Sequence, residues 1–254
     1  MDENALLNFA VSVGKIMLKN GAETHRVEDT IERILSTEEN SMPETFITPT
    51  GIFASIQSPI TGNITKLCRI SDYSINLEKV TMANSLSRDF VNKKIPLEEG
   101  FKKLEVIENL ADFPDKIVVL SYGIVCACFA FIFKGAPIDA VVAFLNGAML
   151  GIFSLFFAKR DVTSFLISLV KGFFVAFFAI SAFKIIPYVN YEIVITGSIM
   201  PLVPGVATTN AVRDVMNRDF LSGACRLLEA SIVAVSVAAG VLAAFAVFDI
   251  LGGV

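Results

Sequence analysis

Five long stretches with few charged residues follow one another in the second half of the chain. A helix needs roughly 20 apolar residues to cross the hydrocarbon core of a bilayer, with about 17 as the lower limit. Backbone polar groups cannot stay unpaired in lipid, so each stretch has to be a helix, or a broken helix shielded by protein. The predicted transmembrane helices cover residues 117–134, 137–158, 162–185, 191–212 and 220–248.

The charged residues are concentrated in the first half. Residues 1–116 contain 13 Lys/Arg and 18 Asp/Glu, against 8 and 7 in residues 117–254. The whole chain is 18% charged, whereas a soluble globular protein carries about a quarter. This asymmetry predicts a soluble domain at 1–115 and a transmembrane domain of five helices at 116–254. The net charge of −4 argues against nucleic acid as a partner.

The first domain is predicted to be α+β. A helix over 4–19 ends at Asn20-Gly21, where a left-handed cap is expected. Two strands, 45–57 and 63–70, are separated by Ser58-Pro59 and Thr61-Gly62. Three more helices are expected: one after Gly21, one over 74–92 and one from Pro96. The buried side of the first of these consists of Val27, Ile31, Ile34 and Leu35.

Basic residues in the short loops predict the orientation, because they favour the cytoplasmic side. With the first domain inside, the inner loops and membrane edge carry Lys159, Arg160, Arg213, Arg218 and Arg226, against Lys134 and Lys184 outside. We therefore expect a multi-pass protein of the cell (inner) membrane, with a cytoplasmic N-terminus and an external C-terminus. The acidic opening Met1-Asp2-Glu3 does not resemble an export signal.

Lys171 and Glu229 lie inside the third and fifth predicted spans, each nine residues beyond the start of its segment. At about 1.5 Å per residue, both lie roughly 13 Å inside the cytoplasmic edge. A charge within the bilayer costs a few kcal/mol, which pairing would partly offset. The sequence favours a charge pair beside a substrate path. The alternative is that Lys171 extends to the headgroups and Glu229 pairs with Arg226.

Pro201, Pro204 and Gly205 should interrupt the fourth span, because each proline removes a backbone donor. Interrupted helices form substrate sites in many transporters, although proline kinks also serve packing. Polar residues continue beyond the break and could line an inner vestibule; they include Asn210, Arg213 and Asp214. Asn146 in the second span is another polar candidate, and helix–helix hydrogen bonding explains it equally well.

The first domain contains no nucleotide-binding loop, nucleophile elbow or metal-ligand pair, so no cofactor or metal is expected. Its charged motif comprises Glu23, His25, Arg26 and Glu28 at the start of the second helix. His25 could act as a general acid or base, but no Ser or Cys partner is apparent. A solvated, ion-paired helix start is favoured over catalysis, and the motif could also gate the inner mouth or contact a partner.

Two motifs resemble those of a known family. Gly21-Ala22-Glu23-Thr24-His25-Arg26-Val27-Glu28-Asp29-Thr30 is similar to the first-domain signature of the bacterial threonine/serine exporter family. Pro201-Leu202-Val203-Pro204-Gly205, followed by Asn210, Arg213-Asp214 and Ser222-Gly223, resembles its membrane signature. His25 departs from the pattern, since tyrosine is common at that position, and this weakens a catalytic role further.

The resemblance implies proton-driven secondary export by a chain similar to the larger subunit of the family's split type. It also implies a small partner of four or five spans, a role in an oligomer and no enzymatic activity. We expect export of threonine- or serine-like amino acids, with succinate-like dicarboxylates as the alternative substrate. The rival functions are a membrane-anchored metabolite sensor or regulator, and, less favoured, an anchored enzyme.

Overall fold

A computed structural model of the chain describes residues 2–38, 41–58, 62–71, 73–111, 113–158, 160 and 162–250. It divides into two compact units. The first, here called the front unit, combines Met1–Ala111 with Gly205–Leu228; the second, the membrane unit, combines Asp112–Pro204 with Glu229–Val254. Pro59, Thr61 and Lys159, which entered the sequence predictions, lie outside the described residues.

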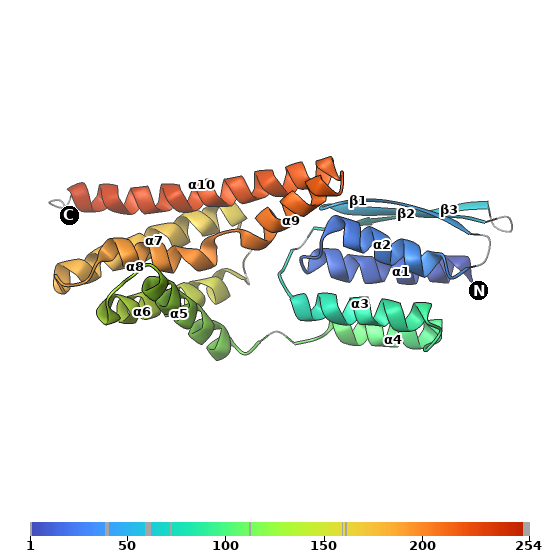
Figure 1. The fold of residues 1–254 in the computed structure, drawn as a ribbon, viewed down its shortest axis with the longest axis horizontal. Helices are drawn as coiled ribbons and strands as arrows, with labels where there is room; N and C mark the ends of the chain where they lie inside the picture. The colour runs from blue at the N-terminus through green and yellow to red at the C-terminus, as the bar shows by residue number, and fades with distance from the viewer. Residues whose placement is uncertain are drawn as a thin grey trace. The chain divides into compact units, whose positions relative to one another are not determined.

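The front unit is built in layers (Figure 1). Helices α1 (Glu3–Lys19) and α2 (Thr24–Leu35) pack against one face of the sheet, and α3 (Leu77–Val91) and α4 (Leu97–Glu108) pack on α1 from the other side. The predicted buried side of α2 is fully enclosed in this core. Gly21 has φ +94°, which confirms the left-handed cap between α1 and α2.

The sheet has three antiparallel strands in the order β1-β2-β3, which are Met42–Thr48, Gly51–Ser58 and Gly62–Arg69. The prediction of one strand over 45–57 was therefore wrong. Thr48 pairs with Gly51, so Pro49 and Thr50 form a tight hairpin turn between two strands. Pro-Thr-Gly carries a turn signal that the long Thr/Ile/Phe pattern concealed. Helix α3 begins later than predicted because the Asn76 side chain accepts a bond from Lys79 N (3.1 Å).

Among its described residues, the membrane unit contains four α-helices and the second part of a fifth. They are α5 (Asp115–Ile132), α6 (Pro137–Ala158), α7 (Ser164–Ile185), α8 (Tyr191–Ile199) and the part of α10 (Phe220–Ile250) beyond Leu228. Small residues let these helices approach closely: an added Cβ would lie 2.6 Å from Tyr122 O at Gly147 and 2.5 Å from Val237 O at Gly172.

Within the described part of the chain, four helices are long and apolar enough to cross a membrane: α5, α6, α7 and α10. The number is five if the bent pair of Tyr191–Leu202 and Gly205–Met216 counts as one span. The structure therefore supports a helical membrane protein with four to five candidate spans and an N-terminal domain containing a small sheet. The sequence boundary at 115/116 assigns residues 205–228 to the transmembrane domain, whereas their contacts lie within the front unit.

Candidate functional site

Asp214 lies on α9 (Gly205–Met216) and caps the N-terminus of α2, 190 residues earlier in the chain. Its Oδ1 accepts a bond from Thr24 N (3.2 Å), and its Oδ2 accepts one from the Thr24 hydroxyl (3.1 Å). The first turn of a helix has unpaired N–H groups and a partial positive charge, which favour a carboxylate there. Glu23, the residue before α2, makes no side-chain cap bond of its own.

Arg226 completes this buried arrangement from the start of α10. Its Nε lies 3.1 Å from Asp214 Oδ2, and its side chain is 6% exposed against 0% for Asp214. The Nε–H is not aligned for a hydrogen bond, so the contact is an ion pair. A second guanidinium nitrogen donates to Ala22 O (3.0 Å). Asp214 thus bonds Thr24 and pairs with Arg226, and all three residues are buried. We call these three residues the polar hub.

Further polar contacts surround the polar hub. Asn210 Nδ2 donates to Gly21 O (3.0 Å), and Arg213 forms an ion pair with Glu23. The Ser222 hydroxyl donates to Ile47 O on β1 (3.2 Å). Gly223 permits close contact between α9 and α10, because an added Cβ would lie 2.9 Å from Ala211 O. The motif that begins at Gly21 and the polar segment that follows the break therefore meet in the front unit.

Three titratable side chains lie together beside the polar hub. His25 and Glu28 of α2 meet Asp219, which precedes α10; one ligand atom from each lies within 4.8 Å of the others. Burial raises the pKa of Glu28, and the charges of Asp219 and Glu32 raise it further. The charge of His25 and a hydrogen bond with the Thr45 hydroxyl lower the pKa of Glu28. Arg26 of the same motif is exposed.

The predicted interruption of the fourth span is present. Helix α8 ends at Ile199, a 3-10 turn η1 covers Met200–Leu202, and α9 begins at Gly205 after Pro204. A cavity of about 200 Å³ adjoins the break within the membrane unit. Its walls are almost entirely apolar and consist of Ile199, Leu202, Val203, Pro204, Ala234, Val237 and Ala238.

Lys171 and Glu229 occupy α7 and α10 of the membrane unit. Lys171 is half-buried and Glu229 is exposed. Among the described residues, no ion pair joins Glu229 to Lys171 or to Arg226. The predicted pairing and the roles of both side chains stay predictions.

Buried polar side chains link the helices of the membrane unit. Asn146 Nδ2 on α6 donates to Val175 O on α7 (3.0 Å). Asn146 Oδ1 and Ser198 Oγ are enclosed, and neither has a hydrogen-bond partner in the described part of the chain. Asp139, which sequence reasoning missed, accepts bonds from Ala136 N (2.8 Å) and Asn190 N (2.7 Å), joining the turns before α6 and α8.

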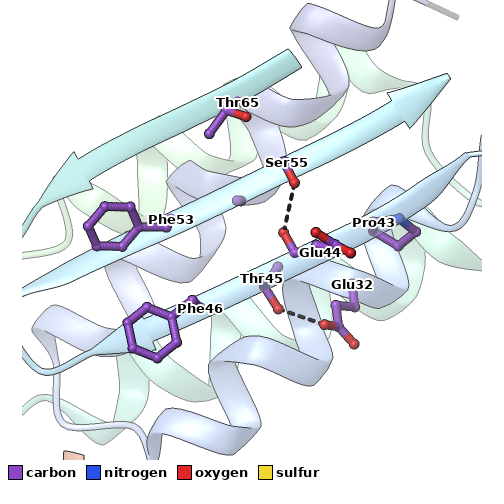
Figure 2. Close-up of a pocket in the computed structure, with 9 residues that line it drawn as sticks. Glu32, Pro43, Glu44, Thr45, Phe46, Phe53, Ser55 and Thr65 are labelled. Carbon is purple, nitrogen blue, oxygen red and sulfur yellow. Dashed lines mark hydrogen bonds between the residues drawn. The ribbon is translucent and has the colours of Figure 1, made fainter. Parts of the chain in front are cut away.

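A separate open pocket of about 430 Å³ lies at the sheet of the front unit (Figure 2). The Thr45 hydroxyl donates to Glu32 Oε1 (2.7 Å) at its rim, and Phe46 lies opposite Phe53 on neighbouring strands. Glu32 and Glu44 bring two carboxylates to the pocket, and none of its described lining residues is a cation. The pocket would therefore disfavour a dicarboxylate and suit a neutral or amine-bearing molecule.

The candidate apolar spans and the interrupted helix support a multi-pass helical membrane protein. An α+β domain is joined to the segment after the break. Residues 8–248 match the ThrE family, described as "Putative threonine/serine exporter". The chain belongs to this family, which confirms the resemblance drawn from the two motifs. The family is one of transporters and points away from an enzyme.

Several curated proteins are similar over nearly the whole chain. A Klebsiella aerogenes protein named "Probable succinate transporter subunit YjjP" is 24% identical over 99% of this chain and 97% of its own length. The Escherichia coli protein of the same name is 23% identical over 99% and 98%. An uncharacterized Schizosaccharomyces pombe protein is 22% identical over 92% of this chain but only 29% of its own length. No solved structure matches the chain.

Proposed function

We propose that this chain is a subunit of a proton-coupled secondary exporter of threonine- or serine-like amino acids. The observation that carries the proposal is the polar hub, which builds the segment after the broken helix into the front unit. A buried ion pair and a helix cap resist separation, so this segment moves with α2. The front unit can thereby control the break at Pro201–Gly205, since interrupted helices accompany the substrate paths of many transporters.

Chain connectivity supports a fourth crossing that is not an ordinary helix. The chain leaves the front unit at Ala111 and returns to it at Gly205. If that unit stays on one side of the bilayer, the intervening chain must cross an even number of times. Helices α5, α6 and α7 provide three crossings, so α8 and η1 must complete the fourth. Their twelve residues extend roughly 20 Å, short of the ~30 Å hydrocarbon core.

This short crossing requires a region that lipid does not fill. Irregular backbone is tolerated at membrane depth only where protein or a water-filled cavity surrounds it. With α10 as the last crossing, the count becomes five, and the two termini lie on opposite sides. The basic residues in the inner loops favour a front unit on the cytoplasmic side of the cell membrane and a C-terminus outside the cell.

Enclosed polar atoms supply hydrogen-bonding capacity for a small polar solute. Asn146 Oδ1 and Ser198 Oγ lack partners among the described residues. Buried polar atoms are normally satisfied by protein or ordered water. We interpret these two atoms as parts of a wet path through the membrane unit. The apolar cavity beside the break would then act as a barrier and not as the polar binding site.

Lys171 and Glu229 are the proposed charged groups of the path. Lys171 would attract a substrate carboxylate, and Glu229 would carry the coupled proton. A zwitterionic amino acid can use both charges, whereas an ionised Glu229 repels a dicarboxylate. Succinate-like dicarboxylates remain the alternative substrate, supported by the names of the two bacterial relatives. The word "subunit" in those names supports a partner subunit. We propose that this partner is a small membrane protein of four or five spans.

Counterflow in liposomes tests the proposal. Purified chain, alone and with its small partner, is assayed with labelled threonine, serine and succinate. Exchange of an amino acid that depends on the pH gradient supports the proposal, and selective exchange of succinate favours the alternative. Glu229→Gln should abolish gradient-driven export, with exposed Glu192→Gln as the matched control. The proposal fails if no counterflow occurs with either preparation.

The sheet pocket favours a second candidate, a membrane-anchored metabolite sensor. Binding of an amine-bearing metabolite by the full chain, without any counterflow, would support this function. Glu32→Gln should weaken such binding. If the chain is instead a transporter subunit, the same substitution should leave counterflow unchanged.

A further inference from the structure

His25, Glu28 and Asp219 converge from two distant parts of the front unit. His25 and Glu28 lie three residues apart on α2, on the same helix face. Asp219 lies between α9 and α10, where its backbone carbonyl accepts a bond from Gly223 N (2.9 Å). The nearest ligand atoms of all three lie within 4.8 Å of one another. We call these residues the His25 cluster.

An unsatisfied carboxylate oxygen on one residue of this cluster indicates a missing positive partner. Asp219 Oδ2 is enclosed and has no hydrogen-bond partner in the described part of the chain. Arg226, a buried cation of the front unit, is already engaged by Asp214 and Ala22 O. Glu28 and Asp219 therefore bring two carboxylates together, and the exposed His25 joins them as a possible cation or ligand. Glu32 and the Thr45 hydroxyl also interact with Glu28.

We propose that the His25 cluster binds a divalent transition-metal ion. One imidazole nitrogen and two carboxylate oxygens form a ligand set suited to Mn²⁺ or Zn²⁺, with water completing the coordination. Atoms bound to one ion at about 2.0–2.2 Å are at most about 4.4 Å apart. Three atoms that share one ion at this distance cannot all lie more than about 3.8 Å from one another. The ligand atoms here lie within 4.8 Å of one another, so they would have to approach by about 1 Å, which the exposed His25 side chain can do.

Metal binding would fasten α2 to the turn that leads into α10. The site adjoins the polar hub through Asp219 N, which donates to Asp214 O (2.8 Å). A bound ion would add a second connection between the motif at 23–28 and the segment after the break. Spacing alone could not reveal this set, because Asp219 is far from His25 in sequence. The inference does not depend on the transported substrate or on transport itself.

Mn²⁺ titration of the full chain in detergent tests the site, followed by loss of the free-ion EPR signal. Mn²⁺ suits the oxygen ligands and limits interference from the four free cysteines. We expect one equivalent to bind to the unmodified chain. His25→Ala and Asp219→Asn should each weaken binding at least tenfold. Asp29→Asn removes a carboxylate from the same helix outside the cluster and should leave binding unchanged.

A thermal readout accompanies the titration, because metal that binds the folded state raises the melting temperature. The unmodified chain and Asp29→Asn should melt at a higher temperature with Mn²⁺, whereas Asp219→Asn should not. If a variant does not fold, His25→Gln and Glu28→Gln replace it with less change in shape. The proposal is overturned if the unmodified chain does not bind Mn²⁺ stoichiometrically. It is also overturned if all folded cluster variants bind Mn²⁺ as tightly as the unmodified chain.

Discussion

Arg226 near the start of α10 lies against Asp214 near the end of α9, with Nε 3.1 Å from Oδ2 and neither side chain more than 6% exposed. Two charges removed from water carry a large desolvation cost, so such a pair persists only with further compensation. Here the carboxylate also caps α2 through Thr24, and the guanidinium binds Ala22 O. The pair therefore fixes where the segment after the break attaches.

Removing one partner of this ion pair should be costly. We expect Arg226→Met or Asp214→Asn to lower the free energy of unfolding by about 3–5 kcal/mol, because each leaves an uncompensated buried group. The double variant should lose less than the sum of the two. Thermal unfolding in detergent, followed by circular dichroism, measures the effect. Arg33→Met breaks an exposed pair with Asp29 and should change stability by less than about 1 kcal/mol. Additive losses would contradict the coupling.

The Thr24 hydroxyl should contribute more to the free energy of unfolding than the Thr24 methyl group. Thr24→Val keeps the shape but removes the donor to Asp214 Oδ2, with an expected loss of about 1–3 kcal/mol. Thr24→Ser keeps the donor and should lose no more than about 1 kcal/mol, the contribution of one methyl group. The same melting experiment separates the two variants. A serine variant as unstable as the valine variant would show that packing, not the bond, dominates.

The close approach of α7 and α10 should depend on Gly240. An added Cβ there would lie 2.1 Å from Leu169 O and 2.7 Å from Phe173 N, so backbone atoms would have to separate. Gly240→Ala should therefore lower the melting temperature and disturb helix packing. Gly205→Ala is the matched control, because nothing lies within 4 Å of its added Cβ. Equal melting temperatures for both variants would argue against this contact.

The sequence predicted elements well and their partners poorly. Span positions and the buried face of α2 follow from composition and helical periodicity, which are local. The sequence placed Asp214 in an inner vestibule and gave no sign that its carboxylate caps α2. A helix N-terminus can be capped by an oxygen from any part of the chain, so sequence spacing does not reveal the capping residue. Arg226 was treated as an edge charge for the same reason. The hairpin at Pro49-Thr50 was visible locally but was masked by strand-forming neighbours.

Lys171 offers a way to separate function from stability. Its half-buried side chain has no ion-pair or hydrogen-bond partner among the described residues. None of the described contacts therefore uses the charge of Lys171 to stabilise the fold. Lys171→Met should leave the melting temperature unchanged or raise it, while counterflow falls at least tenfold. Lys116→Met, at the exposed start of α5, is the control and should change neither. Normal counterflow by Lys171→Met would remove Lys171 from the proposed path.

The two prolines at the break provide the most direct test of the interrupted helix. Pro201 lies in η1 and Pro204 directly precedes α9, so Ala at both positions restores two backbone donors and removes steric crowding at the preceding turns. A proline in a helix interior costs about 3 kcal/mol relative to alanine, so the double variant should favour a continuous helix.

Circular dichroism should then show more helix, and counterflow should fall because the short crossing and its enclosed polar region are lost. Pro187→Ala, in the exposed turn before α8, controls for proline removal and should change neither quantity. Increased helix content with undiminished counterflow would show that transport does not require the break.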